Sequence, residues 1–385
     1  MDRYAGIVRI AGVYQGAWIR KRKRGRGEEK AVTLTGQLLE EMNLDTVNGE
    51  LERLFPEIHF DGTAVLELIM QGDIWGVIRQ MGSIITDAFL MQGSEIRGIF
   101  ISILILGILA ALLTDFADLF QNHQVSDIAF FMVYLLFVTL LLKSYVQTLV
   151  IAKGILTDVT SFMKLFIPTY MIAVGSASGL ATAGAYYQWL TVLTVLIQGG
   201  FLYIVLPAVS TYILLAVING VWMEEKLAFL LELLEKGIGG CIRITIGTVS
   251  GFSVLQAMIS PAIDSLQTVA MQKAAAAIPG IGNLTEGMLK LVVGSAVLIK
   301  NSIGIYITLT LLFICFIPIV KLVLLVGAVK LGTALISVVS DKRMTNCANR
   351  IGNGSFLLLR TALASVGIFI VQIAIITAAT NHGIG

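Results

Sequence analysis

Long runs of apolar residues dominate the chain beyond residue 97 and predict helices that cross a membrane. A helix needs about 20 mostly apolar residues to span a bilayer, because it rises about 1.5 Å per residue. We therefore expect an all-α, polytopic transmembrane protein with about seven spans. The expected spans are Gly98–Leu113, Ile128–Val150, Leu165–Tyr187, Trp189–Asn219, Cys241–Ser260, Ile303–Ser340 and Thr361–Thr380.

The polar and apolar pattern divides the chain into three parts. Residues 1–34 are basic and predict a disordered tail or a segment that contacts anionic headgroups. In residues 35–95, apolar side chains recur three and four positions apart, which predicts amphipathic helices outside the membrane. Residues 96–380 form the transmembrane domain, within which 222–240 and 261–302 are amphipathic and expected at the membrane interface or partly re-entrant.

Composition supports a membrane protein and excludes several other classes. Hydrophobic residues make up 56% of the chain and charged residues 14%, whereas a soluble domain carries roughly 25% charge. A net charge of +2 is too small to indicate nucleic-acid binding. The three cysteines, at positions 241, 315 and 347, lack metal-ligand spacing. We therefore predict no enzyme activity, catalytic residues, cofactor or metal.

The distribution of lysine and arginine predicts an orientation, since basic loops stay on the cytoplasmic side. The segment Thr114–Asp127 is acidic and should face outward. Asp341–Arg360 and Lys226–Arg243 are basic and should face the cytoplasm. In the seven-span arrangement the N-terminus also lies on the cytoplasmic side.

Two glycine pairs are candidates for close helix packing. The pairs are Gly175 with Gly179 and Gly247 with Gly251, each separated by three residues. Such spacing leaves a groove in which another backbone can approach, either within the chain or in another subunit. Leu141, in contrast, is expected to face lipid.

Polar residues around the long Ile303–Ser340 run are candidates for a pathway or a subunit contact. Pro318 frees a backbone carbonyl, and Lys321 follows it in a run that is otherwise apolar. A charge near the bilayer centre costs about 2.5–3.5 kcal/mol and therefore indicates water, a pathway or a partner, unless its stem lets it reach the interface. Lys300 and Asn301 flank the same run and complete this candidate set.

Four of the six prolines suggest an internal repeat. Ile167-Pro168 with Pro207 and Ile278-Pro279 with Pro318 have identical separations. Inverted repeats with broken helices are typical of secondary transporters, which makes a stand-alone transporter the alternative function; coincidence explains the pattern equally simply. An intramembrane hydrolase using Ser178 or Ser250 is a third hypothesis, although all three histidines lie outside the expected spans.

The region from Asp264 to Asp341 carries a resemblance to a known family. The chain resembles the stage III sporulation protein AE family of endospore-forming bacteria, with a similar order of segments from about Leu38 to Thr380. The motif sequences are Ile278-Pro279-x-x-Gly282, Leu298-Ile-Lys300-Asn301, Phe316-Ile-Pro318 and Asp341-Lys-Arg343. The individual residues that match, besides Lys300, Asn301, Pro318 and Lys321, are Asp264, Lys273, Pro279, Gly282, Gly304 and Asp341.

The resemblance implies a function that the residue pattern alone does not give. It implies a multi-pass protein in the mother-cell-derived outer membrane around the forespore. Its partners would be the other proteins of the stage III sporulation A operon, forespore protein Q and the lipid bilayer, and a second copy of the chain is a further candidate. Together these would form a transenvelope channel, similar to the membrane base of a secretion machine, that sustains spore development.

Overall fold

The described part of the protein is entirely helical, which confirms the all-α prediction. The computed structural model describes residues 75–76, 82, 97–98, 100–105, 107–109, 112, 123–178, 180–221, 226–276, 282–338 and 342–380. The main elements are α5 (His123–Ser178), α6 (Leu180–Gly200), the π-helical turn η1 (Phe201–Val205), α7 (Leu206–Val221), α8 (Ala228–Ala276), α9 (Gly282–Ile336) and α10 (Lys342–Ala379). The predicted N-terminal regions 1–34 and 35–95 lie outside the described residues, apart from three positions.

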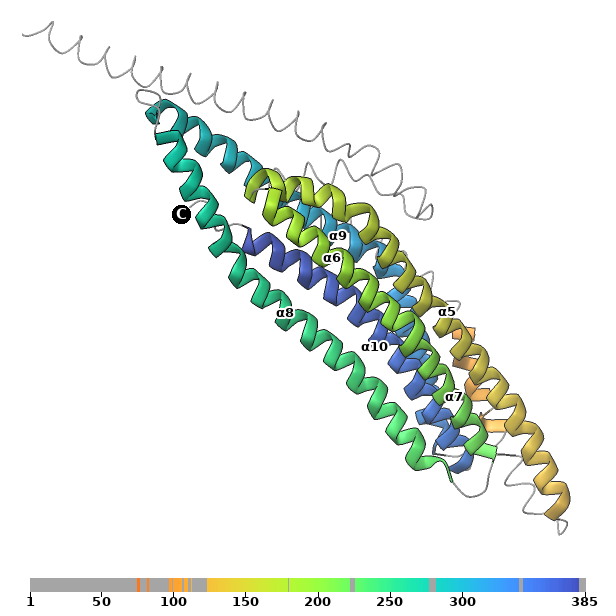
Figure 1. The fold of residues 1–385 in the computed structure, drawn as a ribbon. Coiled ribbons are helices and arrows are strands. Elements are labelled where there is room, and N and C mark those ends of the chain that lie inside the picture. Colours follow the sequence, from red (N-terminus) through yellow and green to blue (C-terminus); the bar gives the residue numbers. More distant parts are fainter. Residues whose placement is uncertain are drawn as a thin grey trace, which may run out of the picture.

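The long helices form an elongated antiparallel bundle (Figure 1). The chain runs up α5, down α6 to α7, up α8, down α9 and up α10. α10 contacts each of the other long helices, and α5 packs along α9. α10 is therefore the element around which the bundle is organised.

Apolar side chains cover both the inner and the outer sides of these helices. On α6, Tyr186, Leu190 and Leu193 are buried, whereas Val195 and Leu196 point outward. A helix that is apolar all round suits a lipid surrounding, because an exposed apolar face is unfavourable in water. By length and composition, five segments of the described chain are able to cross a membrane: Phe131–Ser178, Thr182–Gly220, Ala228–Leu255, Ala296–Ile336 and Lys342–Ala379.

The expected break between the second and third spans is wrong. α5 continues through residues 151–164, so Ile128–Val150 belongs to the same helix as the segment beginning at Leu165. Lys153 and Lys164 are exposed on this helix, and lysine has a good helix propensity. Gly154 is the only glycine in this stretch, which contains no proline. Lys153 and Lys164 therefore lie on the outer face of a continuous helix rather than in a loop.

The turn at the end of α5 also differs from the prediction. α5 ends at Ser178 and α6 begins at Leu180, so the chain reverses inside the predicted span Leu165–Tyr187. The next expected span, Trp189–Asn219, contains α6, η1 and α7 in succession. Pro207 cannot donate a backbone hydrogen bond, and its ring would crowd the carbonyl four residues earlier in a regular α-helix. The wider π-helical turn directly before Pro207 accommodates that ring.

The last three helices extend well beyond the spans expected from the sequence. α8 includes Cys241–Ser260 together with much of 222–240 and 261–276. α9 runs from Gly282 through Pro318 to Ile336, so residues 282–302 continue the same helix. Residues 342–360, expected as a cytoplasmic loop, form the first half of α10. The predicted cytoplasmic loop at 342–360 is therefore wrong as a loop, since these residues are helical. The interfacial position of 222–240 and 261–302 stays a prediction.

The proposed proline repeat is not matched by equivalent helices. Between Pro168 and Pro207 the chain ends α5 and reverses into α6. The corresponding stretch before Pro318 is a single helix from Gly282 onward, and Pro279 lies outside the described residues. Equal proline spacing therefore accompanies two different local folds, as expected if the similarity is a coincidence.

The continuity of α5 can be tested with a proline at an exposed position. Thr157→Pro should remove a backbone hydrogen bond and lower the free energy of unfolding by about 3 kcal/mol or more. Thr157 is exposed, so Thr157→Ala is the matched control and should be tolerated. Thermal unfolding of the detergent-solubilised protein would measure both changes. Equal melting temperatures for the two variants would indicate a loop instead.

Candidate functional site

A completely buried lysine lies where three helices meet. Lys300 of α9 is 0% exposed, and its Nζ donates to Thr380 Oγ1 at 2.7 Å and to the Thr377 carbonyl at 3.3 Å. Both acceptors belong to the last turn of α10, whose carbonyls carry partial negative charge. Lys300 therefore satisfies the C-terminal end of α10 in the way that a basic C-cap residue does.

A glycine makes this meeting point possible. The Tyr170 hydroxyl of α5 lies 2.5 Å from Thr377 Oγ1. A Cβ added at Gly304 would lie 2.7 Å from that same Thr377 oxygen and 3.3 Å from the Tyr170 hydroxyl. α9 thus approaches α5 and α10 through a position that has no room for a side chain. Gly304 and Lys300, both matched to the family motif, belong to one packing unit.

The structure does not unite the four candidate pathway residues. Lys300 and Asn301 lie near the level at which α10 ends, whereas Pro318 and Lys321 lie about 27–32 Å farther along α9, at 1.5 Å per residue. Asn301 Oδ1 is buried and has no hydrogen-bond partner among the described residues, while Pro318 and Lys321 are partly exposed. The four residues therefore occupy two places on one helix, and their role in a pathway or a subunit contact stays a prediction.

Among the described residues, no neighbouring helix fills the groove predicted at Gly247 and Gly251. A Cβ at Gly247 or Gly251 would contact no atom within 4 Å among the described residues. Gly175 is partly exposed, and Gly179 lies outside the described residues. A packing role toward another subunit stays a prediction for these positions. Leu141, expected to face lipid, is 0% exposed and belongs to the core.

The remaining motif residues cannot be assigned contacts. Asp264 and Lys273 lie on α8, and Gly282 is the first residue of α9, but their surroundings are outside the described part. Pro279 and Asp341 precede α9 and α10 and also lie outside it. A structural role for these five stays a prediction.

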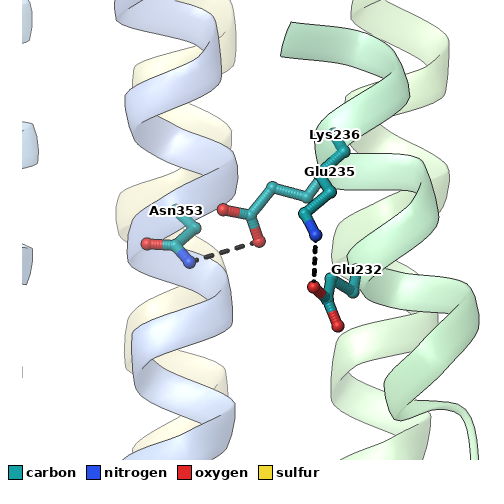
Figure 2. Close-up of polar contacts among 4 residues, drawn as sticks. All are labelled: Glu232, Glu235, Lys236 and Asn353. Carbon is teal, nitrogen blue, oxygen red and sulfur yellow. Dashed lines mark hydrogen bonds and ion pairs between the residues drawn. The ribbon is translucent and has the colours of Figure 1, made fainter. Parts of the chain in front are cut away.

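Sequence reasoning missed a polar junction formed by Tyr212, Glu235, Lys330, Asn349 and Asn353. The Tyr212 hydroxyl donates to Glu235 Oε2 at 2.9 Å. Asn353 Nδ2 donates to the same oxygen at 3.3 Å (Figure 2). Lys330 Nζ donates to the side-chain oxygens of Asn353 and, at 3.3 Å, Asn349. The signal was present in the sequence, because Glu235 shares a helical spacing with Leu231, Ile238 and Ile242, which are buried.

Two further buried pairs join α10 to its neighbours. Gln198 of α6 donates to Ser365 Oγ at 2.6 Å. Gln372 of α10 donates to Ser253 Oγ of α8. Buried amides and hydroxyls must be paired inside an apolar bundle, since lipid offers no partner. These contacts fix the relative positions of the helices.

The chemistry of the described residues is that of helix contacts. Ser178, one of the suggested nucleophiles, donates to the Thr380 carbonyl at 3.3 Å. Among the described residues, no group of three or more histidine, cysteine, aspartate or glutamate side chains is arranged to hold a metal. The side-chain contacts named above join helices to one another within the described part of the chain.

The Gly304 contact yields a direct test. Gly304→Ala should push Thr377 away from Tyr170 and destabilise the protein by about 1–3 kcal/mol, because added bulk in a packed site forces atoms apart. Gly327→Ala on the same helix is the matched control, since its Cβ would meet nothing within 4 Å. It should be neutral or stabilising, by up to about 1 kcal/mol from helix propensity. A melting temperature for Gly304→Ala at or above that of the control would contradict the packing described.

Comparisons with known proteins identify the family. The model of the family described as "Stage III sporulation protein AE" matches residues 60–380. Stage III sporulation protein AE of Bacillus subtilis (strain 168) is 24% identical over 285 residues, which cover 73% of this chain and 70% of that protein. No solved structure matches. Because the family model matches well over half of its length, the chain belongs to the stage III sporulation protein AE family.

Proposed function

We propose that the protein is a membrane subunit of a sporulation-specific transenvelope channel between mother cell and forespore. The observation that carries the proposal is the family match over residues 60–380. The helices support it, because five segments of the described chain are long and apolar enough to span a membrane. The polar contacts support it as well, since those described join helix to helix.

The proposed subunit acts through assembly rather than through chemistry of its own. Its partners would be the other proteins of the stage III sporulation A operon and forespore protein Q. Its place would be the mother-cell-derived outer membrane of the forespore. The long helices favour such a role, because rods longer than a bilayer is thick offer protein-binding surface outside the lipid.

Isolation from sporulating cells tests this proposal against the transporter alternative. An affinity-tagged protein should co-purify with its operon partners after mild solubilisation. When the purified protein alone is reconstituted into vesicles, each of a panel of small solutes should enter no faster than it leaks into empty vesicles. Partner-free purification together with saturable solute uptake would reject the channel-subunit proposal and favour a secondary transporter.

Lys321 is the candidate for a subunit contact within this proposal. It is partly exposed on α9, unlike the buried Lys300. Lys321→Met keeps most of the stem and removes the charge, so it should leave the membrane level normal but impair spore formation. Lys300→Met, in contrast, should lower the protein level, because Thr377 and Thr380 lose their donor.

The comparison between the two lysines decides the role of Lys321. Lys321→Arg should retain part of the activity, since it keeps the charge. Full spore formation by Lys321→Met at a normal protein level would reject a functional charge at this position. The lysine would then only extend its ammonium group to the membrane surface.

A further inference from the structure

The polar junction brings together side chains from four helices of the bundle. Tyr212 comes from α7, Glu235 from α8, Lys330 from α9, and Asn349 and Asn353 from α10. The contacts run in one chain, from the tyrosine through the carboxylate and the Asn353 amide to the ammonium group. The junction therefore connects α8 to the rest of the bundle through charged groups.

The backbone around Asn353 is shaped for this arrangement. A Cβ at Gly352 would lie 3.2 Å from Lys330 Cδ and Cε. A Cβ at Gly354 would overlap the Ile213 side chain and lie 3.3 Å from Tyr212 Cδ1. The two glycines let the lysine stem and the tyrosine ring pack against α10 on either side of the amide. The Asn353 carboxamide offers a donor to Glu235 and an acceptor to Lys330 from the same side chain.

The two charges depend on each other, although they do not touch. Glu235 lies within electrostatic reach of Lys330, and both side chains are only partly exposed. Arg350, a second cation nearby, lies beside Tyr212 and also interacts with Glu232. Removing one partner of a shielded pair leaves an uncompensated charge, which is more costly than removing both.

A neighbouring ion pair on the same helix provides the contrast. Lys236 Nζ lies 2.6 Å from Glu232 Oε1, with 75% and 61% of the two side chains exposed. Figure 2 shows this pair along α8, whereas Glu235 points across to Asn353. An exposed pair one turn apart contributes little to stability. The contact to α10 is thus the one that bears on the position of α8.

We infer that Glu235, Asn353 and Lys330 form a charge-relayed clamp that holds α8 in place against α10, with Lys330 of α9 on the other side of the Asn353 amide. The amide carries the attraction between a carboxylate and an ammonium group on different helices. α8 is fixed a second time, about 27 Å farther along, where Ser253 accepts from Gln372. The clamp sets the position of one end of α8 independently of that second contact.

Cross-linking between α8 and α10 tests the clamp. Gly239 and Leu357 each lie one turn beyond Glu235 and Asn353, and a Cβ at Gly239 would be 3.9 Å from Leu357 Cδ2. Gly239 and Leu357 are replaced by cysteine in a variant in which Cys241, Cys315 and Cys347 are replaced by alanine. A protease site between residues 338 and 342 lets the cross-link be scored as joined fragments. The readout needs only membranes, so it is independent of the proposed role in sporulation.

Each charge variant has a defined expected result. Glu235→Gln or Lys330→Met alone should slow disulfide formation by at least about threefold, because the remaining charge disfavours the docked position. The double variant should return to within about twofold of the parent. Glu232→Gln, the matched control on the exposed pair, should match the parent. Asn353→Leu should behave like a single charge variant, although both charges are present.

A charge exchange separates the clamp from simple packing. With Glu235→Lys and Lys330→Glu combined, the Asn353 amide can rotate to donate to the new carboxylate and accept from the new ammonium group. Cross-linking should therefore recover relative to either reversal alone. The inference is overturned if the single charge variants cross-link at the parental rate, or if the double variant is as slow as the singles. It is also overturned if the double variant fails to accumulate along with the singles.

Discussion

The bundle depends on one constraint: a polar group left unpaired among apolar helices costs free energy, so a partner on another helix or on its own backbone stabilises the bundle. α10 supplies several of these partners, since Ser365 bonds to α6, Thr377 to α5, and Gln372 and Asn353 to α8. Threonine and serine hydroxyls elsewhere bond to the carbonyl four residues earlier, as Thr310 does. Paired polar groups at successive levels of α10 then determine which helices can surround it, and apolar packing fills the space between them.

The helical class and the main apolar segments could be predicted because lipid requires the same pattern wherever a helix crosses it. Helix ends could not. The expected spans leave a break between Val150 and Leu165, yet the lysines there, Lys153 and Lys164, are compatible with a helix whose outer face reaches a polar surrounding. Residues 342–360 are similarly polar and helical, and Asn353 among them bonds to Lys330 and Glu235 of two other helices. A charged residue in the sequence indicates a side chain that is exposed or paired. It indicates a loop only when turn-forming residues lie beside it.

Candidate residues could be predicted where the residue type restricts the surroundings that it tolerates, as for a lysine or a glycine inside an apolar helix. Lys300 and Gly304, singled out from the sequence, do share a packing unit. The spacing of Gly247 and Gly251 shows where a backbone could approach, but it does not identify a neighbour, and none lies there among the described residues. The helical spacing of Glu235 places it on the buried face of its helix, but periodicity does not identify Asn353, 118 positions away in the chain, as its partner.

The length of α5 and α9 has a mechanical consequence. Their 56 and 55 residues make rods of about 80 Å, whereas the hydrocarbon layer is about 30 Å thick. Even a rod tilted by about 40° spends only about 40 Å inside lipid, so roughly half of its length projects beyond it. A change in tilt of about 10° would move a tip 40 Å from the pivot by about 7 Å. A small change in helix tilt within the bilayer would therefore produce a large displacement of the helix ends that project beyond it.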